Sequence, residues 1–371
     1  MRWRLRAVHR LTIVSTTVAD RVTVGGWVGS TNLGDELLFR ILSDLLGARG
    51  VTVGGPSLDP AGTMAVHGTE AHGHLNPSAL RHNLVASDAF VFGPGGLLQD
   101  ETGIWNLPYH LRRIRASRRA GLPWAGIGLG ADGLTTNRGR SQVRRTLVGH
   151  TAIAVRDEAS ADALKALGVE RIVRTADLAF LAEVPQVSGD GVLGVCLRTP
   201  QSGRFRPGAL DHAHRWPDGR ADAMATALDE TARATGLTVR FLAFDARSDG
   251  VVHRQVAERM ATAAEVVEPE LDGLVAALAR VDAMATMRYH GAVLAALGGA
   301  GVVALPFSPK LRSIADDLGP GATVLDDAAT GLPAAVAGVL GQRHHLADHV
   351  DRLRTLAGRN VEVLDELLEA S

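Results

Sequence analysis

The chain has 371 residues, which favours two domains because single hydrophobic cores seldom grow past about 250–300 residues. With 46% hydrophobic and 21% charged residues, it has the composition of a globular protein, and this excludes a disordered chain. A formal net charge of −1 disfavours a nucleic-acid-binding function, and the single cysteine excludes an internal disulfide and suits a reducing compartment.

The N-terminus is basic, with Arg2, Arg4 and Arg6, and continues into a short apolar run at residues 11–14 that Ser15 interrupts. No clear cleavage site follows, and no apolar run reaches the roughly 18–20 residues needed to span a bilayer. We therefore expect a cytoplasmic protein with a basic N-terminal extension or first strand. Peripheral contact of this extension with the inner face of the membrane stays open.

The first half alternates apolar runs with amphipathic segments, the pattern of a parallel sheet covered by helices on both faces. Strands are predicted at residues 21–25, 89–92, 124–128 and 152–155. A helix is predicted at residues 35–46, and its buried side is formed by Leu37, Leu38, Ile41, Leu42, Leu45 and Leu46. A second helix at residues 158–167 is preceded by Asp157 and ended by Gly168, which are clear start and stop signals.

A polar stretch with glycine and proline at residues 184–191 indicates a domain boundary. The second half is predicted to have strands at residues 192–197, 237–243, 281–286 and 301–305, with a long loop at 198–220. We therefore predict an α/β fold with an N-terminal Rossmann-like domain at 1–186, a C-terminal Rossmann-like domain at 187–345 and a C-terminal helix at 346–371.

The first glycine-containing loop, residues 25–34, contains Asn32 and Gly34 and is followed by Asp35. Glycines permit close approach of a ligand to the backbone, and the following helix offers unpaired N–H groups to an anion. The loop has neither the Gly-Lys-Ser/Thr of a P-loop nor the spacing of a dinucleotide fingerprint. Alone, it is more typical of a tight turn capped by Asn32 or Asp35 than of a ligand site.

The second glycine-containing loop, residues 93–101, contains Gly95 and Gly96 and ends in Asp100 and Glu101. The two carboxylates could orient sugar hydroxyls or hold a neighbouring cation, or they could simply stabilise the start of a helix. Downstream, His110 adds a titratable group to the same region and is predicted to bind the substrate.

Arg156 follows the predicted strand at residues 152–155 directly, where it could bind a phosphate or carboxylate bidentately. Pairing with Asp157 or Glu158 is the alternative. Three histidines, His67, His72 and His74, crowd one loop-like stretch that lacks acidic and cysteine partners, so no metal site is predicted there. The only cysteine, Cys196, lies in a buried-looking strand and is assigned to core packing.

The most informative segment is Arg288-Tyr289-His290, followed twenty residues later by Lys310. Each piece lies where a predicted strand gives way to a helix, with Ser308 as N-cap and Pro309 as first residue of the second helix. A helix start already carries partial positive charge, so cations placed there indicate an anionic ligand such as phosphate or carboxylate. In a parallel sheet both positions lie at the carboxyl ends of strands, where ligands bind.

Together these segments resemble the polysaccharide pyruvyl transferase family. The resemblance rests on residues 29–36, 93–100, 156–160, 175–180 and 288–290 and on Lys310, in this order. The sequence departs from the family pattern at Pro94, which replaces a glycine, and at Tyr289, where an aliphatic residue is usual.

The resemblance implies a GT-B-like arrangement of two Rossmann-like domains facing a cleft, with the C-terminal helix packing back on the N-terminal domain. It also implies transfer of a pyruvyl group from phosphoenolpyruvate to a saccharide, with formation of a cyclic ketal and release of phosphate. The acceptor would be a cell-surface polysaccharide or its lipid- or nucleotide-linked precursor. Neither a metal nor a cofactor beyond the donor substrate is expected.

By the same resemblance, Arg288 and His290 bind phosphoenolpyruvate, with His290 as general acid and Lys310 on the phosphate. Arg156 would contact the donor's carboxylate or phosphate from the other domain. The loops at residues 32–35 and 95–100 would line the acceptor side.

Two other functions stay open at this stage. One is a GT-B glycosyltransferase, in which the same cations would bind the diphosphate of a nucleotide sugar. The other is a sugar- or phosphate-binding protein without turnover.

Overall fold

The computed structural model describes residues 19–101, 103, 105–148, 152–186, 189–199, 215–305, 308–327 and 329–371. The basic extension predicted at the N-terminus therefore lies almost wholly outside the described residues, as does most of the predicted loop at 198–220. The described residues form two compact units. The N-terminal unit holds those of 19–30, 35–182 and 354–371, and the C-terminal unit holds those of 31–34 and 183–353.

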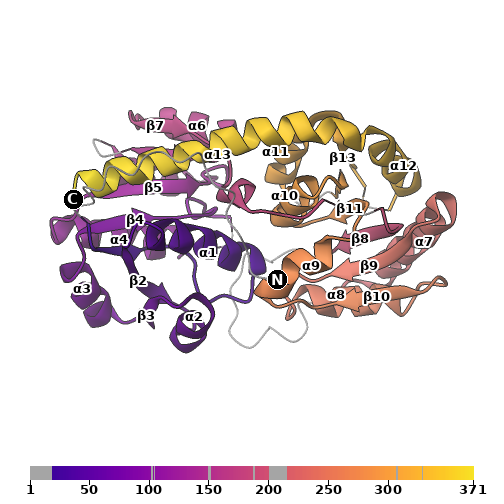
Figure 1. The fold of residues 1–371 in the computed structure, drawn as a ribbon, viewed down its shortest axis with the longest axis horizontal. Coiled ribbons are helices and arrows are strands. Elements are labelled where there is room, and N and C mark those ends of the chain that lie inside the picture. The colour runs from indigo at the N-terminus through magenta and orange to yellow at the C-terminus, as the bar shows by residue number, and fades with distance from the viewer. Residues whose placement is uncertain are drawn as a thin grey trace. The chain divides into compact units, whose positions relative to one another are not determined.

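The N-terminal unit contains a seven-stranded parallel sheet in the order β3-β2-β1-β4-β5-β6-β7 (Figure 1). Its strands are β1 (Arg21–Val24), β2 (Thr52–Ser57), β3 (Glu70–Gly73), β4 (Ala89–Phe92), β5 (Trp124–Leu129), β6 (Ile153–Val155) and β7 (Ile172–Arg174). The helices are α1 (Leu33–Gly47), α2 (Pro60–His67), α3 (Pro77–Val85), α4 (Asn106–Arg119), α5 (Asn137–Leu147) and α6 (Glu158–Lys165), followed by the 3-10 turn η1 (Leu178–Leu181).

One face of this sheet is covered by α3, α4, α5 and α6. Their apolar side chains, among them Leu84, Leu111 and Leu164, pack with Phe90, Phe92 and other strand residues in one core. The six apolar residues predicted to form the buried side of the first helix are all buried in α1. That prediction is confirmed.

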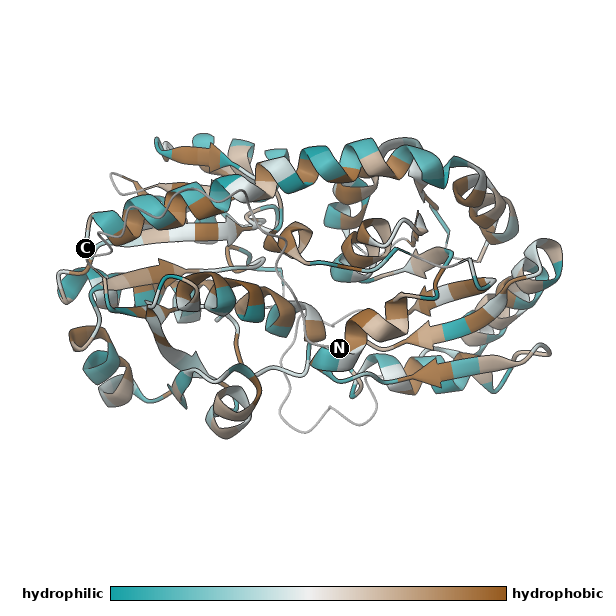
Figure 2. Ribbon diagram, in the orientation of Figure 1, coloured by the Kyte–Doolittle hydropathy of each residue, from teal (hydrophilic) through white to brown (hydrophobic). Residues whose placement is uncertain are grey.

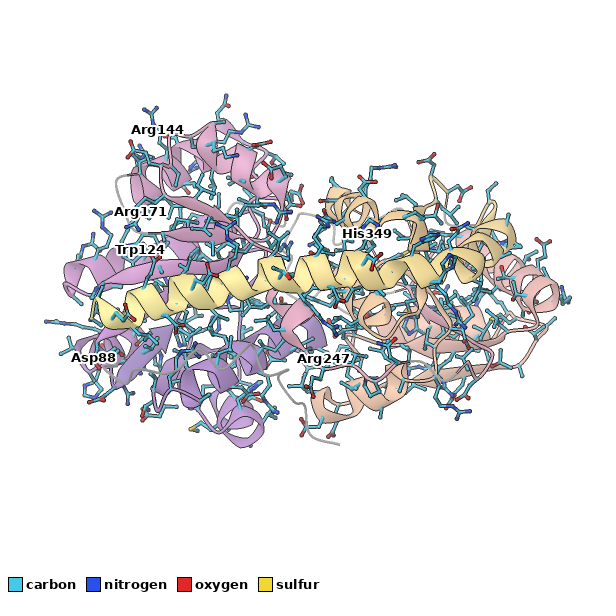
Figure 3. The ribbon with its side chains drawn as sticks, turned by 45° about the horizontal axis from the view of Figure 1, so that its top comes forward. Asp88, Trp124, Arg144, Arg171, Arg247 and His349 are labelled. Atoms are coloured by element: carbon cyan, nitrogen blue, oxygen red, sulfur yellow. The ribbon has the colours of Figure 1, made fainter. Side chains whose placement is uncertain are left out.

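The last helix, α13 (Leu346–Glu369), lies along β5 in Figures 1 and 3. In Figure 2 its hydrophobic and hydrophilic positions alternate, and the apolar positions Ala357, Val361 and Leu364 are buried. Asn360, on the same side, accepts a hydrogen bond from the N–H of Gly128 at 2.9 Å and donates one to the carbonyl of Ala176 at 2.9 Å. These bonds join α13 to the N-terminal unit from Arg354 onward.

The C-terminal unit contains a six-stranded parallel sheet in the order β10-β9-β8-β11-β12-β13. Its strands are β8 (Val192–Cys196), β9 (Thr238–Leu242), β10 (Ala264–Val267), β11 (Ala283–Thr286), β12 (Gly301–Ala304) and β13 (Ala322–Val324). The helices are α7 (Asp218–Thr235), α8 (Asp249–Ala257), α9 (Leu274–Leu278), α10 (Tyr289–Leu297), α11 (Pro309–Leu318) and α12 (Leu332–Gln342), with 3-10 turns η2 (Leu271–Gly273), η3 (Gly319–Gly321) and η4 (Arg343–His345).

The core of the C-terminal unit forms where α7, α8 and α12 pack on alternate residues of β8, β9 and β11. The first part of α13 also belongs to this unit, where His349 donates a hydrogen bond from Nδ1 to the carbonyl of Asp317 at 3.1 Å (Figure 3). The prediction of two parallel sheets flanked by helices is confirmed. None of the helices in the described ranges is long and apolar enough to cross a membrane.

The main error of the sequence analysis lies at residues 52–73, where no strand was predicted and the histidine-containing stretch was interpreted as a loop. Instead, α2 ends at His67 and β3 contains His72. The strand pattern of β2 was weak because its sequence, Thr-Val-Gly-Gly-Pro-Ser, lacks the run of β-branched residues typical of a buried strand.

Candidate active site

The positively charged residues predicted in the C-terminal half lie at one edge of its sheet. Strand β11 pairs with β8 on one side and with β12 on the other, all parallel. Arg288 follows β11, Lys310 follows β12, and Arg198 follows β8. Because the carboxyl ends of parallel strands share an edge, three neighbouring strands bring their cations to the same edge of this unit.

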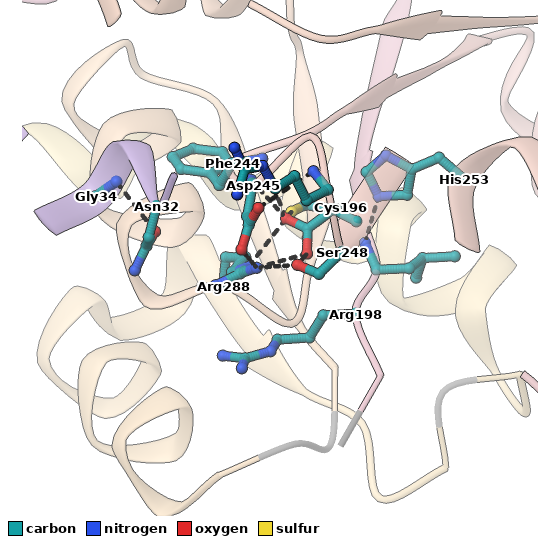
Figure 4. Close-up of polar contacts among 12 residues, drawn as sticks. Asn32, Gly34, Cys196, Arg198, Phe244, Asp245, Ser248, His253 and Arg288 are labelled. Carbon is teal, nitrogen blue, oxygen red and sulfur yellow. Dashed lines mark hydrogen bonds and ion pairs between the residues drawn. The ribbon is translucent and has the colours of Figure 1, made fainter. Parts of the chain in front are cut away.

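Arg288 is the N-cap residue of α10 and is 7% exposed. Its Nη2 donates to Oδ1 of Asp249 at 2.5 Å, its Nε donates to Oδ2 of the same carboxylate at 3.0 Å, and Nη2 also reaches Oγ of Ser248 at 3.1 Å (Figure 4). Burial opposes the positive charge, but Asp249 outweighs this effect and raises the pKa of Arg288 above its ordinary value. Arg288 is thus a fixed cation held by a buried carboxylate.

Asp249 anchors this arrangement and was missed by the sequence analysis. It is fully buried at the start of α8, and its Oδ2 also accepts hydrogen bonds from the N–H groups of Phe244 and Asp245, each at 3.1 Å. The nearby thiol of Cys196 is fully buried, and burial followed by Asp249 raises its pKa well above the ordinary value. The assignment of Cys196 to the core is confirmed.

His290 lies in the first turn of α10 and is 9% exposed. The segment with the predicted acceptor residues Asn32 and Gly34 belongs to the same unit, where Leu33 donates its N–H to the carbonyl of Phe244 at 2.7 Å. A Cβ built at Gly34 would be only 2.1 Å from Nδ1 of His290. Only glycine therefore lets this backbone approach the histidine so closely. Asn32 accepts the N–H of Gly34 at 3.2 Å, so it shapes the turn, as one of the two interpretations of this loop required.

Lys310 is half-buried in the first turn of α11. The predicted N-cap at Ser308 and the proline at the first helical position are both confirmed. Within the described residues, however, the Ser308 hydroxyl makes no capping hydrogen bond and is buried without a partner.

Arg198 is a further cation that the sequence analysis left within a loop. It is partly buried, and in Figure 4 its side chain extends alongside the cluster around Arg288. Burial, and then the charge of Arg288, lower the pKa of Arg198 to about 10. The signal was available in the sequence, because Arg198 follows a predicted strand just as Arg288 does. Two neighbouring buried guanidinium groups favour an anion at this edge.

In the N-terminal unit, Arg156 follows β6 and is buried. Its Nε lies 3.5 Å from Oδ2 of Asp157, and its Nη1 donates to Oδ2 of Asp177 at 3.2 Å. Arg156 therefore forms the ion pair with Asp157 that the sequence analysis named as an alternative. The Nη2 end lies against bare backbone: a Cβ at Gly96 would be 3.5 Å from it and a Cβ at Gly130 only 2.9 Å.

The second glycine loop is held to the loop after β5. Gly95 donates its N–H to the carbonyl of Gly128 at 3.1 Å and accepts the N–H of Gly130 at 3.0 Å. Asp35, half-buried in α1, lies near it, with its Oδ1 3.9 Å from a Cβ built at Gly95. Gly95, Gly96 and Asp35 are thus neighbours within one unit.

Asp100, which was predicted to contact sugar, anchors a turn through both of its carboxylate oxygens. Its Oδ1 accepts hydrogen bonds from the N–H and the hydroxyl of Thr135 at 2.8 and 2.6 Å, and its Oδ2 accepts the N–H of Thr136 at 3.2 Å. Burial acts to raise the pKa of Asp100, but these bonds outweigh it and lower the pKa. Both oxygens therefore hold the turn before α5, whereas the neighbouring Glu101 is exposed.

His110, which was predicted to bind the substrate, is buried in α4. Burial, followed by Arg113 and Arg112, lowers its pKa well below the ordinary value. No group of three or more His, Cys, Asp or Glu residues in the described ranges is arranged to hold a metal ion. His67 instead pairs with Glu36, with Nε2 2.9 Å from Oε2.

Comparison with known proteins identifies both the family and the fold of the chain. A family model described as polysaccharide pyruvyl transferase matches residues 32–309, most of the chain. A search of curated proteins found no match.

Several solved structures share the fold. Alr3699/HepE from Anabaena, in complex with UDP-glucose, is 11% identical over 95% of this chain and 99% of its own, with a TM-score of 0.57. The UDP-GlcNAc 2-epimerase from Methanocaldococcus jannaschii is 10% identical over 93% of this chain and 99% of its own, with a TM-score of 0.61. At these identities the similarity supports the GT-B-like fold of two Rossmann-like domains and nothing finer.

Proposed function

Because the chain belongs to the polysaccharide pyruvyl transferase family, we propose that it transfers a pyruvyl group from phosphoenolpyruvate to a saccharide. The acceptor is a cell-surface polysaccharide or its lipid- or nucleotide-linked precursor. The products are a cyclic ketal and inorganic phosphate.

The observation that carries this proposal is the gathering of Arg198, Arg288 and Lys310 at the carboxyl edge of one sheet, with His290 beside Arg288. Phosphoenolpyruvate carries a phosphate and a carboxylate on a three-carbon skeleton, so its binding requires several cations within a few ångströms. The imidazole of His290, two residues after Arg288, supplies the general acid for the enol carbon.

In the proposed reaction, His290 donates a proton to the methylene carbon of phosphoenolpyruvate, which leaves an oxocarbenium-like centre at the adjacent carbon. The first sugar hydroxyl attacks that carbon and returns its proton to His290. The bond from carbon to the phosphate oxygen then breaks, and phosphate leaves with the electron pair. A second hydroxyl of the same sugar attacks and gives its proton to the phosphate. The fixed cations stabilise the leaving phosphate.

For Arg156 we propose contact with the carboxylate or phosphate of the donor through the Nη2 end of its guanidinium. This end borders the backbone of Gly96 and Gly130, and Asp157 and Asp177 fix the orientation of the guanidinium. If an Arg156→Gln variant binds phosphoenolpyruvate as tightly as the wild type, Arg156 does not contact the donor.

The test is to incubate the protein with phosphoenolpyruvate and a panel of sugars, measuring phosphate release and the ketal methyl signal by NMR. His290→Gln should abolish both while leaving the melting temperature near that of the wild type. His82→Gln, at an exposed histidine of α3, is the matched control and should retain full activity. Near-normal turnover of the His290 variant would contradict its role as general acid.

The fold shared with HepE, whose structure contains UDP-glucose, favours glycosyl transfer from a nucleotide sugar as the second candidate. A thermal-shift experiment separates the two: stabilisation by UDP-glucose and not by phosphoenolpyruvate would favour it over pyruvyl transfer. Phosphate release that never exceeds background with any acceptor would instead favour a binding protein without turnover.

A further inference from the structure

A group of aromatic and basic residues lies at the carboxyl edge of the N-terminal sheet, apart from the residues assigned above. We call Trp27, His72, His74, Tyr109, Arg112 and Arg113 the cationic aromatic cluster. Trp27 follows β1 and His74 follows β3, so the cluster occupies the edge of the sheet at which ligands of such folds bind. The arginines and Tyr109 come from α4.

Tyr109 is the centre of the cluster. The guanidinium carbon of Arg113 lies 4.1 Å from the centroid of its ring and that of Arg112 lies 4.8 Å away. Arg113 also donates to the Tyr109 hydroxyl, and the same oxygen forms a hydrogen bond with Nδ1 of His74 at 2.9 Å. Tyr109 therefore joins the arginines of α4 to the histidine that follows β3.

Among the described residues, no carboxylate pairs with the arginines of the cluster. Across the described ranges, neither Arg112 nor Arg113 has a carboxylate within ion-pair distance, although Arg113 is only 1% exposed. Arg113 donates to the carbonyl of Gly26 at 2.9 Å, and its Nε is buried without a hydrogen-bond partner among the same residues. An arginine buried without a counter-ion is costly, because desolvation is then repaid only by neutral groups.

Burial is the main influence on the titration of these side chains, and positive charge adds to it. Burial lowers the pKa of Arg113 to about 10. Burial and then Arg113 also lower the pKa of His74, while for His72 burial outweighs a hydrogen bond to Gly73, with Arg113 adding to the decrease. A bound anion would oppose the part of the decrease in the two histidine pKa values that Arg113 causes.

The same cluster presents aromatic surface. The half-buried rings of Trp27 and Tyr109 meet edge to face, with centroids 5.8 Å apart and planes at 77°. Such rings combine an apolar face with a polar end, which suits the C–H face of a sugar ring next to a charged substituent. Arg112 is exposed at this position, and its Nη2 donates to the carbonyl of His74 at 2.8 Å.

We propose that the cationic aromatic cluster binds the saccharide acceptor through an anionic group on the sugar, either a phosphate or a carboxylate. The proposal rests on the proposed function, because it names the class of the acceptor for that reaction. A neutral sugar would offer the rings the same apolar face but would leave the two arginines without a counter-ion.

The experiment is isothermal titration calorimetry of the full chain without phosphoenolpyruvate, using glucose 1-phosphate, glucuronate and methyl glucoside. At least one anionic sugar should bind at least tenfold more tightly than methyl glucoside, and more weakly as salt is added. Arg112→Gln should reduce that affinity about tenfold, the loss of one charge-assisted hydrogen bond. Arg118→Gln, an exposed arginine on the same helix, is the matched control and should change little.

Each outcome decides the proposal. Preference for glucose 1-phosphate assigns the site to phosphate-linked acceptors, and preference for glucuronate assigns it to acidic sugars. Equal affinity for methyl glucoside, no detectable binding of either anionic sugar, or an unchanged Arg112→Gln variant would overturn it. Because these titrations contain no phosphoenolpyruvate, failure of pyruvyl transfer is detected separately by the phosphate-release assay.

Discussion

Replacing Gly34 by alanine should inactivate the protein without unfolding it. Gly34 is in the first turn of α1, and its backbone lies directly against the ring of His290. An added Cβ would be 2.1 Å from Nδ1, 2.8 Å from Cγ and 3.0 Å from Cε1 of that ring. Since the obstacle is the proposed general acid itself, the substitution tests both the geometry and the mechanism.

The size of the effect follows from these distances. Ordinary contact between such atoms begins near 3.4 Å, so the ring or the α1 backbone must move by about 1 Å. A misplacement of about 1 Å at a catalytic group can reduce the rate about 10²-fold. Forcing one extra carbon into a packed site typically costs about 1–3 kcal/mol of unfolding free energy, which a chain of this size should survive.

The assay is kcat/KM for phosphate release, measured together with thermal unfolding. We expect a loss of about 100-fold for Gly34→Ala with the cooperative transition retained. Gly47→Ala, at the other end of the same helix, is the control because nothing lies within 4 Å of a Cβ built there. If Gly34→Ala keeps activity within about twofold of the wild type, the close approach to His290 has no catalytic importance.

Three further predictions concern the C-terminal unit. Arg198→Gln should raise the KM for phosphoenolpyruvate about tenfold or more, because one cation that binds the donor is lost. Arg198→Lys should raise this KM less, since lysine keeps the positive charge. An unchanged KM in the Gln variant would mean that the anion binds elsewhere. Lys310→Ala should also raise the requirement for phosphoenolpyruvate, and a change confined to acceptor KM would mean that Lys310 contacts the acceptor. His253 is buried and accepts the N–H of Leu197 at 2.9 Å, and burial lowers its pKa to about 4. Below pH 6.5, His253 is therefore protonated in the unfolded chain but stays neutral in the folded chain until the pH approaches 4. The free energy of unfolding falls as the pH decreases through this range. Between pH 7 and pH 5, His253→Gln should lose about 2 kcal/mol less unfolding free energy than the wild type in urea titrations, and equal losses would contradict the assignment.

Local patterns in the sequence were sufficient to predict some of the regular elements, although not β2 and β3. The buried side of α1 follows from apolar residues at helical spacing, and β4 from a short apolar run of four residues. Caps were equally local: Asp157 precedes α6 and accepts the N–H of Ser160 at 2.7 Å, as its position before the predicted helix indicated. Such signals depend only on neighbours in the chain, so one sequence contains them in full.

The sequence also indicated where candidate functional residues lie, because a strand followed by a helix places its junction at the ligand-binding edge of a parallel sheet. Arg288, His290 and Lys310 were selected as candidates in this way. The hydrogen-bond partners of each side chain could not be predicted from its position in the sequence. Asp100, predicted to contact sugar, holds a turn through Thr135 and Thr136.

Only the tertiary structure decided which charges neutralise one another. Asp249, 39 residues before Arg288 in the chain, becomes its partner because β9 and β11 both flank β8. Arg113 receives no carboxylate within the described residues, whereas Arg156 receives two. Strand order brings distant segments together, and burial then determines the energy of each charge. Neither quantity is a property of a local segment, so the sequence determined the positions of the cations and the fold determined their roles.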